Sequence, residues 1–520
     1  MLWAGISAQS RGEVMYRITM LRLRVATPRS RNCTSRSRSC TSRSRSWVAR
    51  FQVGLLLAGL GLVTNACVFD SGGVQGYWPS DQGVDHAPPK PDVAPDIALD
   101  ILAPDTQPPC GGKSCPLGCN TEEDRCNRMR PSNIDPEAND VDYDEAVTAI
   151  MLNASPEAPI IINADTGEIP GFTDSPDKAV REGISHVVLP QVDTNGTTIP
   201  NAPEVAVFVF DALQITPGTV VRVVGSYPVI FYVRTTVQID GTLLVNGSST
   251  APGPSGGGGG GNPEMAASYG SCGESGEKGV HKDSFPAEWT SGGGGGGHGT
   301  EGAPGAKVKC STDWAPEGAA GGILGTPSLI PLHGGCGGGA GGGPVAGGYQ
   351  GGNGGSGGGA LQISAGTSLV IGTNGHINAG GSGGRGGESG AAGGGGGAGG
   401  AILLEAPLLK IEGLIAANGG GGGAGSESAI SGNGDDGDDG ASSIAPPSGG
   451  SAGLLSFGTN GGNGGAGTTQ PTSGQDSELR CNGGGGGGGA GRIRLNATSA
   501  TIKVTPSPTP STNDDPLLYW

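Results

Sequence analysis

One pattern of alternating apolar residues occurs three times in this chain and constrains its fold more than any other feature. The copies span 237–247, 369–379 and 409–419, and the second has two extra residues before its central glycine. Alternation with period two is typical of β-strands, and strands that recur between turn-rich spacers indicate a repetitive β architecture. The aligned positions are Val237, Ile239, Gly241, Leu243, Val245 and Gly247, then Leu369, Ile371, Gly375, Ile377 and Ala379, then Leu409, Ile411, Gly413, Ile415, Ala417 and Gly419.

A second alternating phrase occurs at 361–365, 402–406 and 493–497, each time after a run of glycine and alanine. Its first two copies lead directly into a copy of the first pattern. A repeating unit is therefore a glycine tract followed by three short strands. We predict an all-β fold, a parallel β-helix-like solenoid in which stacked strands bury one face. A β-sandwich with disordered insertions and a mostly disordered low-complexity chain are the alternatives.

Glycine makes up 107 of the 520 residues, about three times its ordinary share. Too few large side chains remain in the glycine-rich part for a conventional core. Residues 133–250 have ordinary apolar content and are predicted to form a first β region, followed by a glycine-rich solenoid region over 251–520. The glycine tracts would be long loops extruded from one corner, or they would pack as extended strands.

The N-terminal region reads as an export signal. We interpret residues 1–46 as an over-called or disordered leader without function, and 47–66 as a signal peptide with an eleven-residue apolar run at 53–63. That run is too short to span a bilayer as a helix. Cys67 follows the small residue Ala66 and is the predicted lipidation site, with ordinary cleavage and secretion as the alternative. The proline-rich, acidic stretch 67–109 is predicted to be a disordered tether.

Eight cysteines follow Cys67, an even number that favours disulfides in an exported chain. Four fall in a small cysteine-rich module over 110–132, and the others are scattered through glycine-rich sequence. Zinc binding is the rival interpretation, but no paired C-x-x-C is present. The candidates are Cys110, Cys115, Cys119, Cys126, Cys272, Cys310, Cys336 and Cys481.

Charge argues against one class of partner. Residues 1–66 contain eleven Arg and a single acid, Glu13, so the remainder carries 19 basic and 46 acidic residues. Because nucleic-acid phosphates attract Lys and Arg, a mature chain this acidic is not expected to bind nucleic acid. The expected partner is instead a membrane, through the lipid anchor, with extracellular polysaccharide as a further candidate.

Several motifs together resemble a known type of protein. They are Cys67 after the signal, Cys115-Pro-Leu-Gly-Cys119 with Arg130-Pro-Ser-Asn133, the phrase Ile215-Thr-Pro-Gly-Thr-Val220, and the closing Gly489-Ala-Gly-Arg-Ile-Arg-Leu495. In these features the chain resembles the glycine-rich predicted lipoproteins of myxobacteria and related bacteria. The resemblance implies a β architecture and a place in the cell envelope, at the outer membrane or cell surface, rather than a reaction.

Residue types that carry chemistry are sparse. The six histidines are isolated in sequence, and we interpret His298 and His333 as exposed loop residues. An acidic loop supplies oxygen ligands on a flexible glycine backbone, which suits Ca²⁺, although a solvated acidic loop is the simpler interpretation. No other cofactor is indicated. The candidate calcium ligands are Asn433, Asp435, Asp436, Asp438 and Asp439.

Two tryptophans and three carboxylates define the alternative functions. Trp289 and Trp314 lie in long loops, where they would stack on sugar rings or anchor the loops. Asp240 and Glu412 align just before the central glycine of their repeats and could act as paired carboxylates, as in polysaccharide cleavage, although an exposed corner is the simpler interpretation. Glu405 is the third carboxylate within the strand phrases. We expect a non-catalytic, lipid-anchored surface protein with a structural role, with an adhesin or carbohydrate-binding protein, or else a polysaccharide-degrading enzyme, as alternatives.

Overall fold

The computed structural model describes residues 110, 115–139, 141, 148–171, 184–248, 257–263, 272, 275–284, 287–309, 313–343, 350–426, 432–452, 458–511 and 517. The predicted leader, signal peptide and tether lie outside the described residues, as do Cys67 and Cys310. The described residues form strands and extended segments without a helix, which confirms the all-β class.

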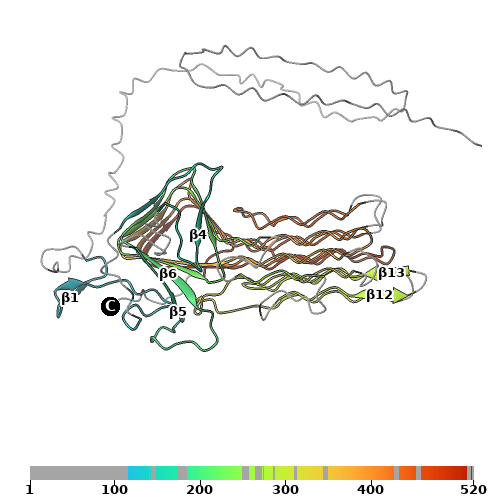
Figure 1. Ribbon diagram of the computed structural model, residues 1–520, viewed down its shortest axis with the longest axis horizontal. Coiled ribbons are helices and arrows are strands. Elements are labelled where there is room, and N and C mark those ends of the chain that lie inside the picture. The colour runs from blue at the N-terminus through green and yellow to red at the C-terminus, as the bar shows by residue number, and fades with distance from the viewer. Residues whose placement is uncertain are drawn as a thin grey trace, which may run out of the picture. The chain divides into compact units, whose positions relative to one another are not determined.

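A ten-stranded sheet and a five-stranded sheet contain most of the strands (Figure 1). The ten strands are β3 (Ile150–Leu152), β5 (Ser185–Leu189), β6 (Val205–Phe210), β7 (Leu213–Ile215), β9 (Val229–Val233), β10 (Thr236–Ile239), β14 (Ala360–Ala365), β15 (Ser368–Ile371), β17 (Ala401–Ile411) and β19 (Arg492–Ile502). The five are β4 (Ile160–Asn163), β8 (Val220–Val224), β11 (Thr242–Leu244), β16 (His376–Asn378) and β18 (Leu414–Ala416). Two short hairpins pair β1 (Cys119–Asn120) with β2 (Arg125–Cys126), and β12 (His281–Ser284) with β13 (Ala287–Thr290).

Equivalent strands of the repeats pair in parallel and in register. Leu369 pairs with Val237 on one side and with Leu409 on the other, and Ile377 pairs with Leu243 and Ile415. The second phrase aligns in the same way through β14, β17 and β19. The alignment predicted from the sequence is therefore confirmed residue by residue. We call the consecutive strands of one repeat a layer, as in β14, β15 and β16; in the next layer β17 continues through the first two strand positions. Within the described part of the two large sheets, only β5 and β6 pair antiparallel.

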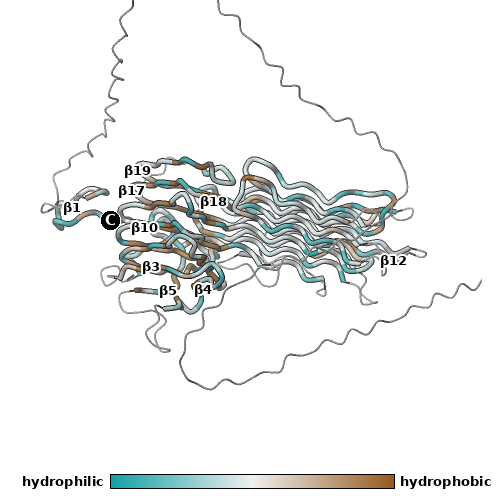
Figure 2. Tube along the Cα trace, turned by 90° about the horizontal axis from the view of Figure 1, so that it is seen from above, coloured by the Kyte–Doolittle hydropathy of each residue, from teal (hydrophilic) through white to brown (hydrophobic). Residues whose placement is uncertain are grey.

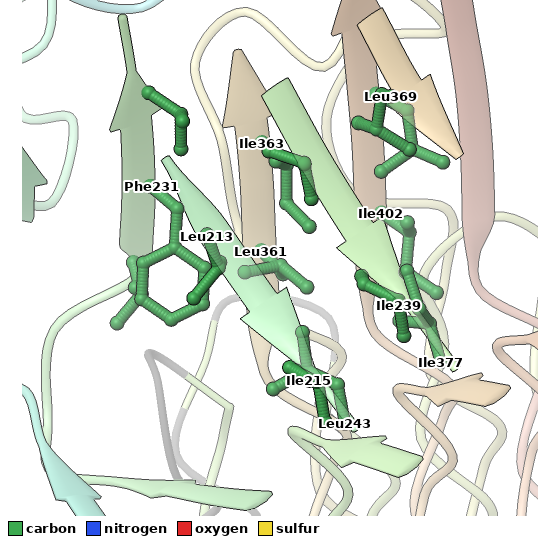
Figure 3. Close-up of a cluster of buried hydrophobic side chains, with 14 of the residues drawn as sticks. Leu213, Ile215, Phe231, Ile239, Leu243, Leu361, Ile363, Leu369, Ile377 and Ile402 are labelled. Carbon is green, nitrogen blue, oxygen red and sulfur yellow. The ribbon is translucent and has the colours of Figure 1, made fainter. Parts of the chain in front are cut away.

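The two sheets enclose one apolar core because each layer turns a corner between them. Asp240 and Gly241 separate β10 in the large sheet from β11 in the small sheet, so this pair forms a corner and not a hairpin. Leu361 and Ile402 enter the core from the large sheet, and Leu243 and Ile377 enter it from the small sheet (Figure 3). The outer face of the large sheet is also covered in part, by a second apolar cluster. This explains why β6, β9 and β14 are buried on both faces.

The glycine tracts pack side by side as a bundle of extended segments, seen in pale colours beside the apolar sheets in Figure 2. Segment 391–400 shows the rule. The amides of Gly393 and Gly396 donate to Gly483 and Gly486, both at 2.9 Å. The amides of Gly394, Gly397 and Gly400 donate to segment 379–385, and those of Ala392, Gly395 and Ala398 donate to segment 336–342, again at every third residue. A repeat of three residues without internal hydrogen bonds is the signature of the polyproline II conformation.

Close backbone approach explains why these segments are almost pure glycine. At Gly395, a Cβ would overlap the carbonyl group of Gly294 and lie 2.8 Å from the amide nitrogen of Gly295. A side chain there would force two hydrogen-bonded segments apart. The glycine tracts are thus packed extended segments, the second of the two arrangements predicted, and are not extruded loops.

The path of the chain links the bundle to the layers. Segment 417–426 follows β18, the last strand of its layer. Segments 350–359, 391–400 and 482–491 lead into β14, β17 and β19, each of which begins a layer. The hairpin β12–β13 lies at the end of the bundle remote from the sheets, which we call the distal end (Figure 1). We call the opposite end, where the bundle meets the sheets, the junction.

Candidate functional site

A buried carboxylate, Glu405, joins the cysteine module to the sheet. Glu405 lies on β17, on the face opposite to the core, and its side chain is only 1% exposed. It accepts five hydrogen bonds. The donors are Ser132 N (3.2 Å), Ser132 Oγ, Gln362 Nε2 (2.7 Å), Ser364 Oγ (2.7 Å) and Asn496 Nδ2 (3.0 Å).

The same network fixes residues 129–133, at the C-terminal end of the cysteine module. Asn133 Nδ2 donates to Gln362 Oε1 and to the Leu329 carbonyl, both at 3.0 Å. The hydroxyl of Tyr232 donates to the Met129 carbonyl at 2.6 Å. A buried carboxylate is stable only when donors surround it. The arrangement therefore anchors residues 129–133 to three strands, and sequence reasoning found neither this role nor these partners.

The junction gathers three basic side chains. His298 is 1% exposed, not an exposed loop residue as its sequence context predicted, and its Nδ1 lies 2.9 Å from the Gly399 carbonyl. Burial lowers the pKa of His298 to about 4, and the charges of Arg492 and His333 add to the effect. Burial also lowers the pKa of His333 and of Arg492. We call these three residues the junction cluster.

The acidic loop proposed for calcium is an outer segment of the bundle. Asp436 Oδ1 and Asp439 Oδ1 accept hydrogen bonds from the amides of Gly386 and Gly383, both at 2.8 Å, and Asp436 also pairs with Arg385. Two of the four predicted aspartate ligands thus bind backbone amides of the neighbouring segment. Asn433, Asp435 and Asp438 are exposed. Among the described residues, no group of three or more His, Cys, Asp or Glu side chains is placed to hold a metal ion.

The two tryptophans differ in environment. Trp289 is 1% exposed and packs against Val308, Ala315 and Cys481, so it offers no ring face to a sugar in this arrangement. It anchors the segments instead, which was the other interpretation of its sequence context. Trp314 is 40% exposed, with Lys309 Nζ 6.0 Å from its ring centroid. Trp314 is therefore partly exposed, unlike Trp289.

Asp240 and Glu412 stack at one corner, with Gly372 between them, as their alignment predicted. Glu412 is bound by Lys503 and by Lys410 (3.1 Å), and these hydrogen bonds lower the pKa of its carboxyl group. Asp240 accepts a hydrogen bond of 2.9 Å from Gln238. The two carboxylates are separated by two strand spacings, roughly 9–10 Å between backbones.

The prediction of disulfides is confirmed for seven of the eight cysteines. Cys110 pairs with Cys119, Cys115 with Cys126, and Cys272 with Cys336, with Cα–Cα distances of 5.6, 5.1 and 5.5 Å. Cys481 is also disulfide-bonded, and Cys310 lies outside the described residues. The first two bridges close the hairpin β1–β2, where the module is too short to hold a core.

Within the part of the chain that the structure describes, no helix is long and apolar enough to cross a membrane. No family model, curated protein or solved structure matches this chain. The proposals below therefore rest on the geometry of the chain itself.

Proposed function

We propose that this chain is a non-catalytic, lipid-anchored protein of the cell envelope, in which a parallel β-solenoid carries a rigid glycine bundle. The observation that supports the proposal is the bundle itself. An inner segment such as 391–400 donates hydrogen bonds to three neighbours in turn, so it has no freedom to move as a loop. The in-register stacking of the layers supports the solenoid part of the proposal.

The geometry suits display at a distance. A segment of about ten residues in the polyproline II conformation spans roughly 30 Å, because each residue advances by about 3.1 Å. The bundle would therefore hold its distal turns roughly 30 Å from the junction. In this function the bundle presents its distal end, where the hairpin β12–β13 lies, while the glycine segments supply stiffness.

The anchoring part of the proposal comes from the sequence. Cys67 after a short apolar run, followed by a proline-rich tether, fits a lipidated N-terminus and a spacer from the membrane. The resemblance to glycine-rich lipoproteins supports the same location, at the outer membrane or cell surface. The disulfides suit an exported protein.

Two measurements test the proposal. The N-terminal peptide of the protein isolated from its own membranes should carry a diacylated or triacylated Cys67, and a Cys67→Ser variant should lose membrane association. An epitope inserted between residues 452 and 458 should bind antibody on intact cells. An unmodified Cys67, or an epitope that is reached only after lysis, would contradict anchored display.

A carbohydrate-binding role is the second candidate, and the exposure of Trp314 beside Lys309 favours it. Aromatic rings bind the apolar faces of sugars by stacking. Polysaccharide binding should fall in a Trp314→Ala variant that keeps its fold. Trp289→Ala is the variant for comparison. Removal of that buried ring should lower the stability of the distal end, and any binding with it, whereas Trp314→Ala should lower binding alone. Unchanged binding in Trp314→Ala would exclude this surface.

A further inference from the structure

The segments that carry the junction cluster meet around Gly399 and Gly400. The imidazole of His298 lies against the Gly399 carbonyl, and the amide of Arg492 donates to the Gly400 carbonyl at 2.9 Å. Gly335 packs so closely on Gly399 that a Cβ would overlap its carbonyl oxygen. His298 and Arg492 thus contact the backbone of Gly399 and Gly400 directly, and His333 is two residues from Gly335, which packs on Gly399.

His333 reaches this point from the chain on the other side. It precedes Gly335 by two residues, and a Cβ on Gly325 would lie 4.0 Å from His333 Cδ2. The amide next to Gly325, that of Leu324, donates to the His298 carbonyl at 3.0 Å. His298 and His333 are therefore held on the same side of the junction.

Arg492 brings a charge that has no ion-pair partner among the described residues. Its side chain is partly buried, and its Nε is buried without a hydrogen-bond partner. No carboxylate among the described residues forms an ion pair with it, in contrast to Arg385 with Asp436 and Arg130 with Asp135. A buried guanidinium nitrogen without an acceptor is costly, and the cost disappears when an oxyanion supplies one.

We propose that Arg492, with His333 and His298 beside it, binds a small oxyanion at the junction. The planar fork of the guanidinium matches two oxygens of a carboxylate, sulfate or phosphate group. The partial exposure of Arg492 and His333 gives the anion access, while the buried His298 forms the inner wall. The ligand is either a free inorganic ion or the acidic group of a saccharide, and both present the same oxygens.

Binding can be measured on the purified full-length chain. Thermal unfolding is followed at constant ionic strength while chloride is replaced by phosphate, sulfate or glucuronate, with glucose as the uncharged control. Sulfate and phosphate stabilise proteins generally by exclusion from their surface, in a way that does not saturate. The expected result is an additional, saturable rise in the melting temperature. Saturation by glucuronate at lower concentration than by phosphate identifies a saccharide acid, and the reverse order identifies a free ion.

Substitutions locate the site. Arg492→Gln should weaken oxyanion binding at least tenfold, and Arg492→Lys should weaken it less because it keeps the charge. Arg385→Gln, which removes an arginine already paired with a carboxylate, should leave binding unchanged. A saturable rise of equal midpoint in the wild type and in Arg492→Gln would overturn the proposal, as would the absence of any saturable rise.

A second readout does not depend on the stability of the variants. In the wild-type protein, the imidazole ¹H–¹³C signals of His298 and His333 should move together and saturate at the same anion concentration as the thermal effect. The signal of His186, which lies in the sheet beside Phe208, is the internal control. Histidine signals of the junction cluster that stay fixed during the titration would also overturn the proposal.

Discussion

A single methyl group in the middle of the bundle should be among the most damaging changes possible in this protein. In Gly395→Ala, the new Cβ overlaps the Gly294 carbonyl, so segments 291–297 and 391–400 must separate by about 1 Å. Separation strains two hydrogen bonds between them, from Gly293 to Gly393 (3.1 Å) and from Gly296 to Gly396 (2.9 Å).

The magnitude follows from these contacts. Overpacking in a dense interior costs about 1–3 kcal/mol, and each weakened hydrogen bond adds about 1 kcal/mol. Gly395→Ala should therefore lower the free energy of unfolding by about 3–5 kcal/mol. Ala398→Gly is the control in the same segment, and it should cost less than about 2 kcal/mol through lost methyl burial and added chain entropy.

Guanidinium unfolding with intact disulfides, followed by far-UV circular dichroism, measures the difference. Hydrogen exchange then shows where it arises, since the amides of 293–296 should exchange faster in Gly395→Ala than in Ala398→Gly. Equal unfolding midpoints for the two variants, with unchanged exchange at 293–296, would refute the close-packed bundle.

Two further predictions concern the buried polar residues. The pKa of His298 is about 4 in the folded protein and about 6.5 in the unfolded chain. Between these two values the unfolded chain binds more protons than the folded protein. The free energy of unfolding is therefore highest above pH 6.5 and falls by about 3 kcal/mol as the pH drops to 4. His298→Asn keeps a donor for the Gly399 carbonyl, and in this variant the free energy of unfolding should no longer fall between pH 6.5 and 4 by that amount. Chemical denaturation at a series of pH values measures it, and the same pH profile as in the wild type would show that His298 is not the titrating group. Glu405→Gln places an amide donor among the donors of Ser132 and Asn496 and should cost about 2–4 kcal/mol, with faster hydrogen exchange at 129–133. Glu412→Gln, at the corner between β17 and β18, should leave that exchange unchanged, and equal behaviour of the two variants would contradict the anchoring role.

The layers were predictable because their information is local. Alternation marks each strand, and the same phrase recurs, so aligning the copies also aligns the strands that pair. The bundle was predictable only as one of two arrangements. Its contacts are backbone hydrogen bonds between glycines, and no side-chain pattern tells which tract lies beside which.

The buried polar sites could not be found from the sequence for a related reason. Glu405 and Ser132 are 273 residues apart, and His298 and Gly399 are 101 apart, so nothing local identifies either pair. His298 follows a run of six glycines, which suggested an exposed loop. The burial arises because neighbouring glycine segments close around it.

The glycine segments of the bundle fix one another's positions without help from side chains. Segments 417–426 and 432–440, for example, are each hydrogen-bonded to neighbours of their own. In such a bundle the spatial neighbours of a segment, and not the residues next to it in the sequence, determine where it lies.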